Sequence, residues 1–208
     1  CHSLKYSRWG RIAKDLDIPE EIFTDNLVFG KGVKLGDRMT GSMKSADSES
    51  WFGIAPPDLS LITRLHGSDW TYTYLRTFYE DSSKPYGVNN LVYPGAAMPN
   101  VLASMQGQQI LSCKDVAVIA SNGGVRRDEF GNDITEEKCG FLKTIAGSGT
   151  LSEQEFDEVI FNLVNFITYI GEPSRSDRER MGWYAILFFI VFTAFSYLLF
   201  REYQKDYH

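Results

Sequence analysis

The sequence has little positive charge. It contains 21 lysines and arginines against 27 aspartates and glutamates, so its formal net charge is −6. Because nucleic-acid binding depends on clustered cations that contact phosphates, this balance argues against a nucleic-acid partner. A basic protein partner fits an acidic chain better.

Histidine and cysteine are also scarce, with three of each among 208 residues. No serine or cysteine lies in a recognisable nucleophile motif, so we interpret His66 as a structural residue rather than a catalytic one. Hydrophobic residues make up 43% of the chain and aromatic residues 14%. This composition excludes a disordered or collagen-like chain and allows one substantial core.

The acidic residues are unevenly distributed. From residue 128 to residue 158, nine acidic side chains accompany only Lys138 and Lys143, which gives this stretch a net charge of −7. Two interpretations stay open. The stretch is either an ordinary solvated face or a surface that attracts a cationic partner electrostatically.

One long run carries no charge at all. Residues 181–200, MGWYAILFFIVFTAFSYLLF, contain no charged side chain. At about 1.5 Å per residue, twenty helical residues span about 30 Å, which is the thickness of the hydrocarbon layer of a membrane. We predict a transmembrane anchor at 181–200 in contact with lipid and a short tail at 201–208; the alternative is a buried core helix.

The remaining patterns predict a mainly α fold with long loops. Ser152 and Glu155 have the spacing of a capping box, and apolar residues recur at helical spacing behind them, which predicts a helix over 153–170. Helices are also expected over 1–16 and 58–79, whereas 24–50 shows little periodicity.

The stretch 107–150 has a different character. It contains a β-prone run, VAVIA at 116–120, and turn signals at Asn122-Gly123-Gly124 and Gly131-Asn132-Asp133. We predict a small hairpin-like insertion there. The polar segment 173–180 is expected to form a hinge before the membrane span.

The first two residues are a candidate site. Cys1-His2 matches the end of the C-x-x-C-H signature, in which cysteine thiols attach haem and the histidine ligates its iron. Met98 is a candidate sixth ligand, because a thioether is a soft iron ligand and Pro94 and Pro99 restrict the backbone around it. The alternative for a single methionine is filling a gap in a core. We assign that role to Met39, Met43, Met105 and Met181.

Several stretches, in order along essentially the whole chain, resemble the cytochrome c1 family. They are CHSLKYSR at 1–8, WFGIAPPDLSLITRLHG at 51–67, YPGAAMPN at 93–100 and VNFITYIGEP at 164–173, followed by the membrane span. The most specific pieces are APPDLS at 55–60 and EPSRSDRERMG at 172–182. The resemblance implies a c-type cytochrome fold over 1–172, fused to the anchor.

The resemblance also implies the roles of individual residues. His2 and Met98 would be the axial ligands of one covalently attached haem c, and Cys1 would be one of two thioether cysteines. The first cysteine of the signature would lie three residues before Cys1, so either the chain continues upstream or one thioether holds the haem. Arg64 would pair with a haem propionate or be a plain surface arginine. The residues that would pack on the haem edge are Pro56 and Pro57.

If Cys1 binds haem, Cys113 and Cys139 are left as a pair inside the insertion. In an oxidising compartment such a pair forms a disulfide. The alternative is two separate buried thiols.

The function implied by the resemblance is one-electron transfer within the cytochrome bc1 complex, the ubiquinol–cytochrome c oxidoreductase. The chain, not an enzyme by itself, would take electrons from a Rieske iron–sulfur subunit, assemble with cytochrome b and reduce a soluble cytochrome c. It would lie in a bacterial inner membrane with the haem domain in the periplasm. The alternatives are a free-standing membrane-anchored cytochrome c and a haem-free anchored binding or assembly protein.

Overall fold

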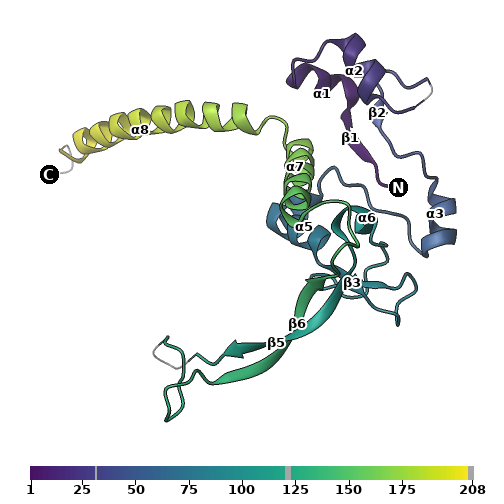
Figure 1. Ribbon diagram of the computed structural model, residues 1–208. Coiled ribbons are helices and arrows are strands. Elements are labelled where there is room, and N and C mark those ends of the chain that lie inside the picture. Colours follow the sequence, from purple (N-terminus) through teal and green to yellow (C-terminus); the bar gives the residue numbers. More distant parts are fainter. Residues whose placement is uncertain (31, 120–122, 206–208) are drawn as a thin grey trace.

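The computed structural model describes residues 1–30, 32–119 and 123–205 (Figure 1). Within these ranges the fold is mainly helical, with short antiparallel strand pairs β1–β2 and β3–β4 and the longer hairpin β5–β6. The fold class predicted from the sequence is therefore confirmed. The helices are α1 (Trp9–Asp15), α2 (Glu20–Leu27), α3 (Ser45–Phe52), α4 (Ile62–His66), α5 (Ser68–Arg76), α6 (Ala103–Gln106), α7 (Glu153–Gly171) and α8 (Arg175–Lys205). The strands are β1 (Leu4–Arg8), β2 (Arg38–Met39), β3 (Phe78–Glu80), β4 (Val88–Asn90), β5 (Gln109–Ala117) and β6 (Thr135–Thr144).

Helix α7 is the element on which the rest of the core packs. The Ser152 side chain accepts a hydrogen bond from the Glu155 backbone N–H, and the Glu155 carboxylate accepts one from the Ser152 N–H, which completes the expected capping box. The helix then continues to Gly171. The prediction of a helix over 153–170 is confirmed.

Two apolar clusters contact α7 at different points along its length. Near its start, Phe156 and Ile160 pack with Leu75 of α5. At its end, Ile170 packs with Ile12 of α1 and Phe23 of α2. Helix α7 thus packs against both the first thirty residues and the middle of the chain. Met39 packs against the second cluster and Met105 against the first, as gap-filling methionines do.

The helix expected over 1–16 is wrong in its first half. Residues 4–8 form strand β1, and α1 begins only at Trp9. The backbone N–H groups of Lys5 and Tyr6 donate to the side chains of Asp58 and Ser60. These bonds to a distant segment replace the local bonds that a helix would make.

Two other local expectations differ from the structure. Residues 58–79 form two helices, α4 and α5, because Gly67 adopts φ 93°, which interrupts the helix between them, and β3 follows from Phe78. The stretch 24–50, expected to be irregular, includes the end of α2, the short strand β2 and most of α3.

The hairpin expected within 107–150 is present and projects from the body of the molecule (Figure 1). Cys113 of β5 and Cys139 of β6 lie opposite each other and are joined by a disulfide, so the predicted bridge is confirmed. The Gly131 N–H donates to the Asp128 carbonyl at the second predicted turn. Ala120 of the β-prone run and Asn122 of the first turn signal lie outside the described residues.

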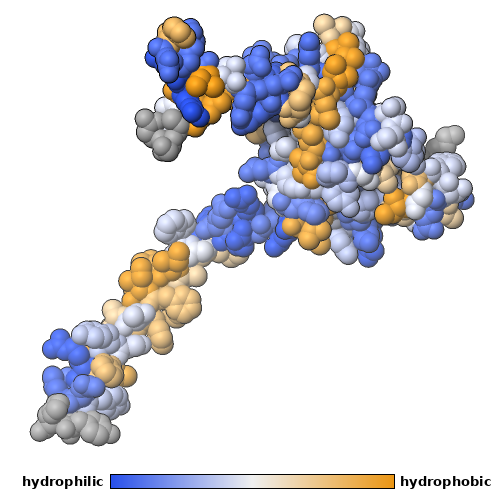
Figure 2. All heavy atoms as spheres, turned by 90° about the horizontal axis from the view of Figure 1, so that it is seen from below, coloured by the Kyte–Doolittle hydropathy of each residue, from blue (hydrophilic) through white to orange (hydrophobic). Residues whose placement is uncertain are grey.

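Helix α8 includes the predicted membrane span at 181–200 and is long and apolar enough to cross a membrane. Figure 2 shows apolar residues over the middle of this helix and polar residues at both ends. None of its apolar segment is buried in the protein, which argues against the alternative of a core helix. Met181 is 62% exposed, so the expectation that it fills a core gap is wrong.

The segment expected to be a hinge, 173–180, is mostly helical. Only residues 172–174 separate α7 from α8, and ion pairs such as Arg175–Glu179 lie along the first turns of α8. The division of the chain into a haem domain, hinge, anchor and tail stays a prediction. Residues 206–208 of the predicted tail lie outside the described residues.

Candidate functional site

His2 is oriented by a hydrogen bond to a segment 55 residues away. Its Nδ1 lies 2.7 Å from the carbonyl oxygen of Pro57. In the tautomer with the proton on Nδ1, the ring donates to this oxygen and the lone pair of Nε2 is left for another partner. Metal-ligating histidines characteristically donate their second ring N–H to a backbone carbonyl or carboxylate. This is an arrangement in which a histidine can serve as a metal ligand.

The APPDLS segment forms the support for this histidine. The Leu59 N–H donates to the Ser3 carbonyl at 2.9 Å, and the Lys5 N–H donates to the Asp58 carboxylate at 2.9 Å. Burial raises the pKa of Asp58, but hydrogen bonds from Ser60 and Lys5 outweigh that effect, so its pKa lies below the ordinary value. The ionised carboxylate therefore helps to fix the strand that follows His2.

Gly41 lies directly behind the first two residues. A Cβ atom at this position would be 2.6 Å from the His2 carbonyl oxygen, a distance that real Cβ atoms do not reach. The Gly41 N–H also donates to the Ser3 hydroxyl at 2.8 Å. The close approach requires glycine here.

Cys1 is exposed and free, since the other two cysteines form the disulfide. An exposed thiol followed directly by a histidine matches the end of the haem-attachment signature.

Met98 lies in the loop between β4 and α6 and is half-buried. It packs against the cluster of Leu75, Phe156 and Ile160, and so does Met105. Packing alone therefore does not distinguish a ligand from a gap-filling methionine.

Arg64 is exposed on α4, near the point where this helix meets the end of α7. Over the described ranges 1–30, 32–119 and 123–205, no carboxylate forms an ion pair with it. Its guanidinium is thus available for an anionic group. Of the two prolines expected at the haem edge, Pro56 is half-buried and Pro57 is exposed.

The segments around these residues expose large apolar side chains. Leu65, one residue after Arg64, is 75% exposed. Leaving such a side chain in water forgoes about 1.5–3 kcal/mol of burial free energy. An apolar cofactor face would cover surface of this kind, so the side chains fit a haem. The others on these segments are Trp51, Ile54, Leu61, Tyr93 and Val101.

His66, the last residue of α4, begins an aromatic stack that continues over Trp70 and Tyr74 of α5. Its ring stacks on Trp70 with centroids 4.2 Å apart, and Trp70 stacks on Tyr74 at 5.1 Å. Tyr74 in turn meets the buried Phe78 edge-on. The four residues are spaced four apart, and this i, i+4 pattern was the signal that could have revealed the stack. The contacts support the structural interpretation of His66.

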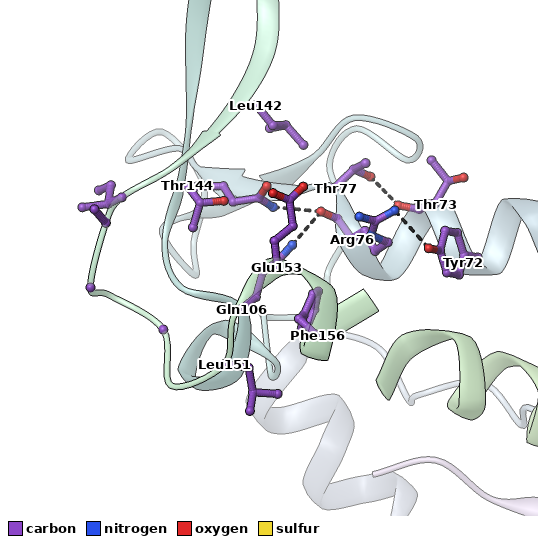
Figure 3. A pocket seen from close by; sticks show the side chains of 15 residues that line it. Tyr72, Thr73, Arg76, Thr77, Gln106, Leu142, Thr144, Leu151, Glu153 and Phe156 are labelled. Atoms are coloured by element: carbon purple, nitrogen blue, oxygen red, sulfur yellow. Dashed lines mark hydrogen bonds between the residues drawn. The ribbon is translucent and has the colours of Figure 1, made fainter. Parts of the chain in front are cut away.

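A cavity of about 470 Å³ lies where the hairpin joins α5, α6 and α7 (Figure 3). The side-chain amides of Gln106 and Gln109 both donate to the Arg76 carbonyl in its lining. None of Cys1, His2, Arg64 and Met98 lines this cavity, so it is separate from the predicted site.

Comparison with known proteins identifies the family, although no family model matches the sequence. The chain is 43% identical, over all 208 residues, to a protein of Allochromatium vinosum named cytochrome c1, and covers 79% of that protein. It is 36% identical over the same length to a Nitrosomonas europaea protein named ammonia monooxygenase gamma subunit, of which it covers 77%. The resemblance of the four motifs thus extends over the whole sequence, and the chain belongs to the cytochrome c1 family.

Proposed function

We propose that this chain carries single electrons through a haem c attached at Cys1 and ligated by His2 and Met98. The observation that carries the proposal is the 2.7 Å contact between His2 Nδ1 and the Pro57 carbonyl oxygen. With the proton on Nδ1, this contact fixes the ring and leaves the lone pair of Nε2 for iron. Membership of the cytochrome c1 family supports an electron-transfer role.

A bound haem c supplies a reversible one-electron couple, whose potential His/Met ligation raises. The residues of the chain provide the surroundings. Around a bound haem, the apolar side chains near Ile54 and Leu65 would exclude water. The guanidinium of Arg64, which has no ion-pair partner among the described residues, is suited to a propionate. Pro94 and Pro99 limit the backbone freedom of the loop on either side of Met98.

The proposed partners are those of a cytochrome bc1 complex. Electrons would come from a Rieske iron–sulfur subunit and leave to a soluble cytochrome c, with cytochrome b beside α8 in the membrane. We place the haem domain on the periplasmic side of a bacterial inner membrane. The similarity to cytochrome c1 and the long apolar helix α8 support this assembly.

The relative named as an ammonia monooxygenase subunit raises a second candidate, a subunit of a monooxygenase assembly. The identity to that protein is lower, 36% against 43%, which favours the first proposal.

Purification of the full chain from its native membrane tests the proposal. We expect a c-type pyridine haemochrome and copurification with cytochrome b and an iron–sulfur protein. A haem-free preparation would contradict the redox function. Copurification with monooxygenase subunits would favour the second candidate, and a haem protein without any of these partners would favour a free-standing anchored cytochrome c.

A further inference from the structure

We propose that Asn89 and Asn90 are positioning residues that hold the loop carrying Met98 in the conformation needed to present its sulfur. The inference rests on the proposed function, because it takes Met98 as the iron ligand.

The loop needs such support because it has no secondary structure of its own before α6. Strand β4 ends at Asn90 and α6 begins at Ala103, and Met98 lies between them. The apolar cluster contacts the Met98 side chain but does not fix the backbone around it. Backbone hydrogen bonds to neighbouring groups must do so.

Asn90 binds the start of the loop through its side chain. It is fully buried, with 0% of its surface exposed. Its Oδ1 accepts hydrogen bonds from the N–H groups of Val92, at 2.9 Å, and Tyr93, at 3.1 Å. Its Nδ2 donates to the Tyr74 carbonyl on α5 at 2.8 Å. The first turn of the loop is therefore tied to a core helix.

Asn89 binds the next part of the loop in the same manner. It is 7% exposed, and its Oδ1 accepts from the Gly95 N–H at 2.8 Å and from the Asn90 N–H at 2.9 Å. Its Nδ2 donates to the carboxylate of Asp81 at 2.9 Å. Gly95, with φ 81°, is three residues before Met98.

The two amides are themselves fixed by the strands. Asn90 pairs with Phe78 and Asn89 with Tyr79 in the β3–β4 ladder. Burying an amide costs free energy unless its donors and acceptors are satisfied. The loop N–H groups at 92, 93 and 95 are among the donors that satisfy these two side-chain oxygens. The paired strands β3 and β4 thus fix the position from which the loop to Met98 starts.

The test uses the full-length holoprotein in detergent. Asn89→Leu keeps the branched shape and the number of heavy atoms, although it is bulkier, and removes the acceptor for Gly95. Asn89→Ser shortens the side chain without adding bulk. In the reversed pair, Asp81→Asn with Asn89→Asp, the new carboxylate accepts from Gly95 and the new amide donates to it. Asn165→Leu, on the exposed side of α7, is the matched control.

The main readouts are carbon monoxide binding to the reduced haem and the weak far-red band of oxidised Met-ligated haem. Loss of one to two hydrogen bonds should raise the fraction of haem without the methionine about tenfold. We expect stronger carbon monoxide binding and a weaker band in both single Asn89 variants. As a third readout, we expect faster hydrogen exchange of the N–H groups of Val92, Tyr93 and Gly95. All three readouts should recover in the reversed pair.

The outcomes separate the two proposals. If the unmodified protein lacks the far-red band, Met98 is not the ligand and the proposed function fails in that part. If the band is present and the Asn89 variants match Asn165→Leu in all three readouts, the positioning role is refuted. The positioning role is also refuted if the single Asn89 variants weaken methionine ligation and the reversed pair does not restore it, since general destabilisation would then explain the weaker ligation.

Discussion

Removal of the Cys113–Cys139 disulfide should open the β5–β6 hairpin and leave the rest of the fold intact. The bridge joins residues 26 apart in sequence. A crosslink closing a loop of that length stabilises by about 3.5 kcal/mol on the chain-entropy estimate. Cys113→Ala and Cys139→Ala each remove this whole contribution.

The charges beside the bridge make the hairpin depend on it. Next to the cysteines, Lys114 lies opposite Lys138 and Asp115 lies opposite Glu137. Like charges facing each other across two strands destabilise the pairing. An ion pair between Lys138 and Glu136 offsets only part of this repulsion.

The effect should stay local because the hairpin adds little to the main core. Its strands are largely exposed, and neither cluster on α7 contains a residue of β5 or β6. A change of about 3.5 kcal/mol corresponds to amide exchange up to roughly several hundredfold faster in the strands. Thermal unfolding of the helical core should change little.

Hydrogen exchange measured by mass spectrometry tests this reasoning. The double variant should resemble either single variant, because all three open the same loop. Added salt should slow exchange in the variants by screening the like charges. Unchanged exchange in β5 and β6 would refute the account, as would two free thiols in denatured, unreduced protein.

Three further predictions concern the core, the support of His2 and the acidic stretch. Ile160→Ala, at a fully buried position, should lower the free energy of unfolding by about 2–5 kcal/mol, measured by denaturant titration with exposed Phe161→Ala as the comparison. Because the pKa of Asp58 is lowered in the folded chain, its stabilisation is present above the ordinary carboxyl pKa and is lost as pH falls through the lowered value. When the free energy of unfolding is plotted against pH, Asp58→Asn should therefore reduce the fall in stability at acid pH. An unchanged fall would contradict this. Neutralising Glu136 and Glu137 together should slow oxidation of the reduced protein by a basic cytochrome c mainly at low ionic strength. An unchanged salt dependence of the rate in stopped-flow experiments would show that these carboxylates are part of an ordinary solvated face.

Elements with strong local signals were predictable from the sequence. The capping box at Ser152 and the uncharged run at 181–200 define α7 and α8, because local caps and apolar length are sufficient for such helices. The first residues could not be predicted in this way. Residues 4–8 have helical-looking composition, but Asp58 and Ser60, more than fifty residues away, bind their backbone.

The acidic stretch shows the same limitation. The sequence presents nine acids as one run, but the fold divides them between the hairpin and the start of α7. Five of the nine carboxylates have hydrogen-bond or ion-pair partners that charge counting could not reveal. They are Asp128, Asp133, Glu136, Glu155 and Asp157.

The candidate site was predictable in its residue types but not in its supports. Cys1, His2 and Met98 follow from motif and family resemblance. The contact of His2 with Pro57 and the amide bonds of Asn89 and Asn90 to the loop depend on tertiary placement. No spacing in the sequence indicates them.

The most direct test of the central claim is a redox titration of the full-length protein and its Met98→Leu variant. Leucine keeps the packing against Phe156 and Ile160 but cannot ligate iron. We expect the haem to stay covalently bound, since attachment involves Cys1, while the potential falls steeply and the far-red band disappears. Met105→Leu should leave both unchanged. The account would be contradicted if Met98→Leu left the potential and the band unaltered while Met105→Leu lowered the potential and abolished the band. That result would assign the ligand to Met105.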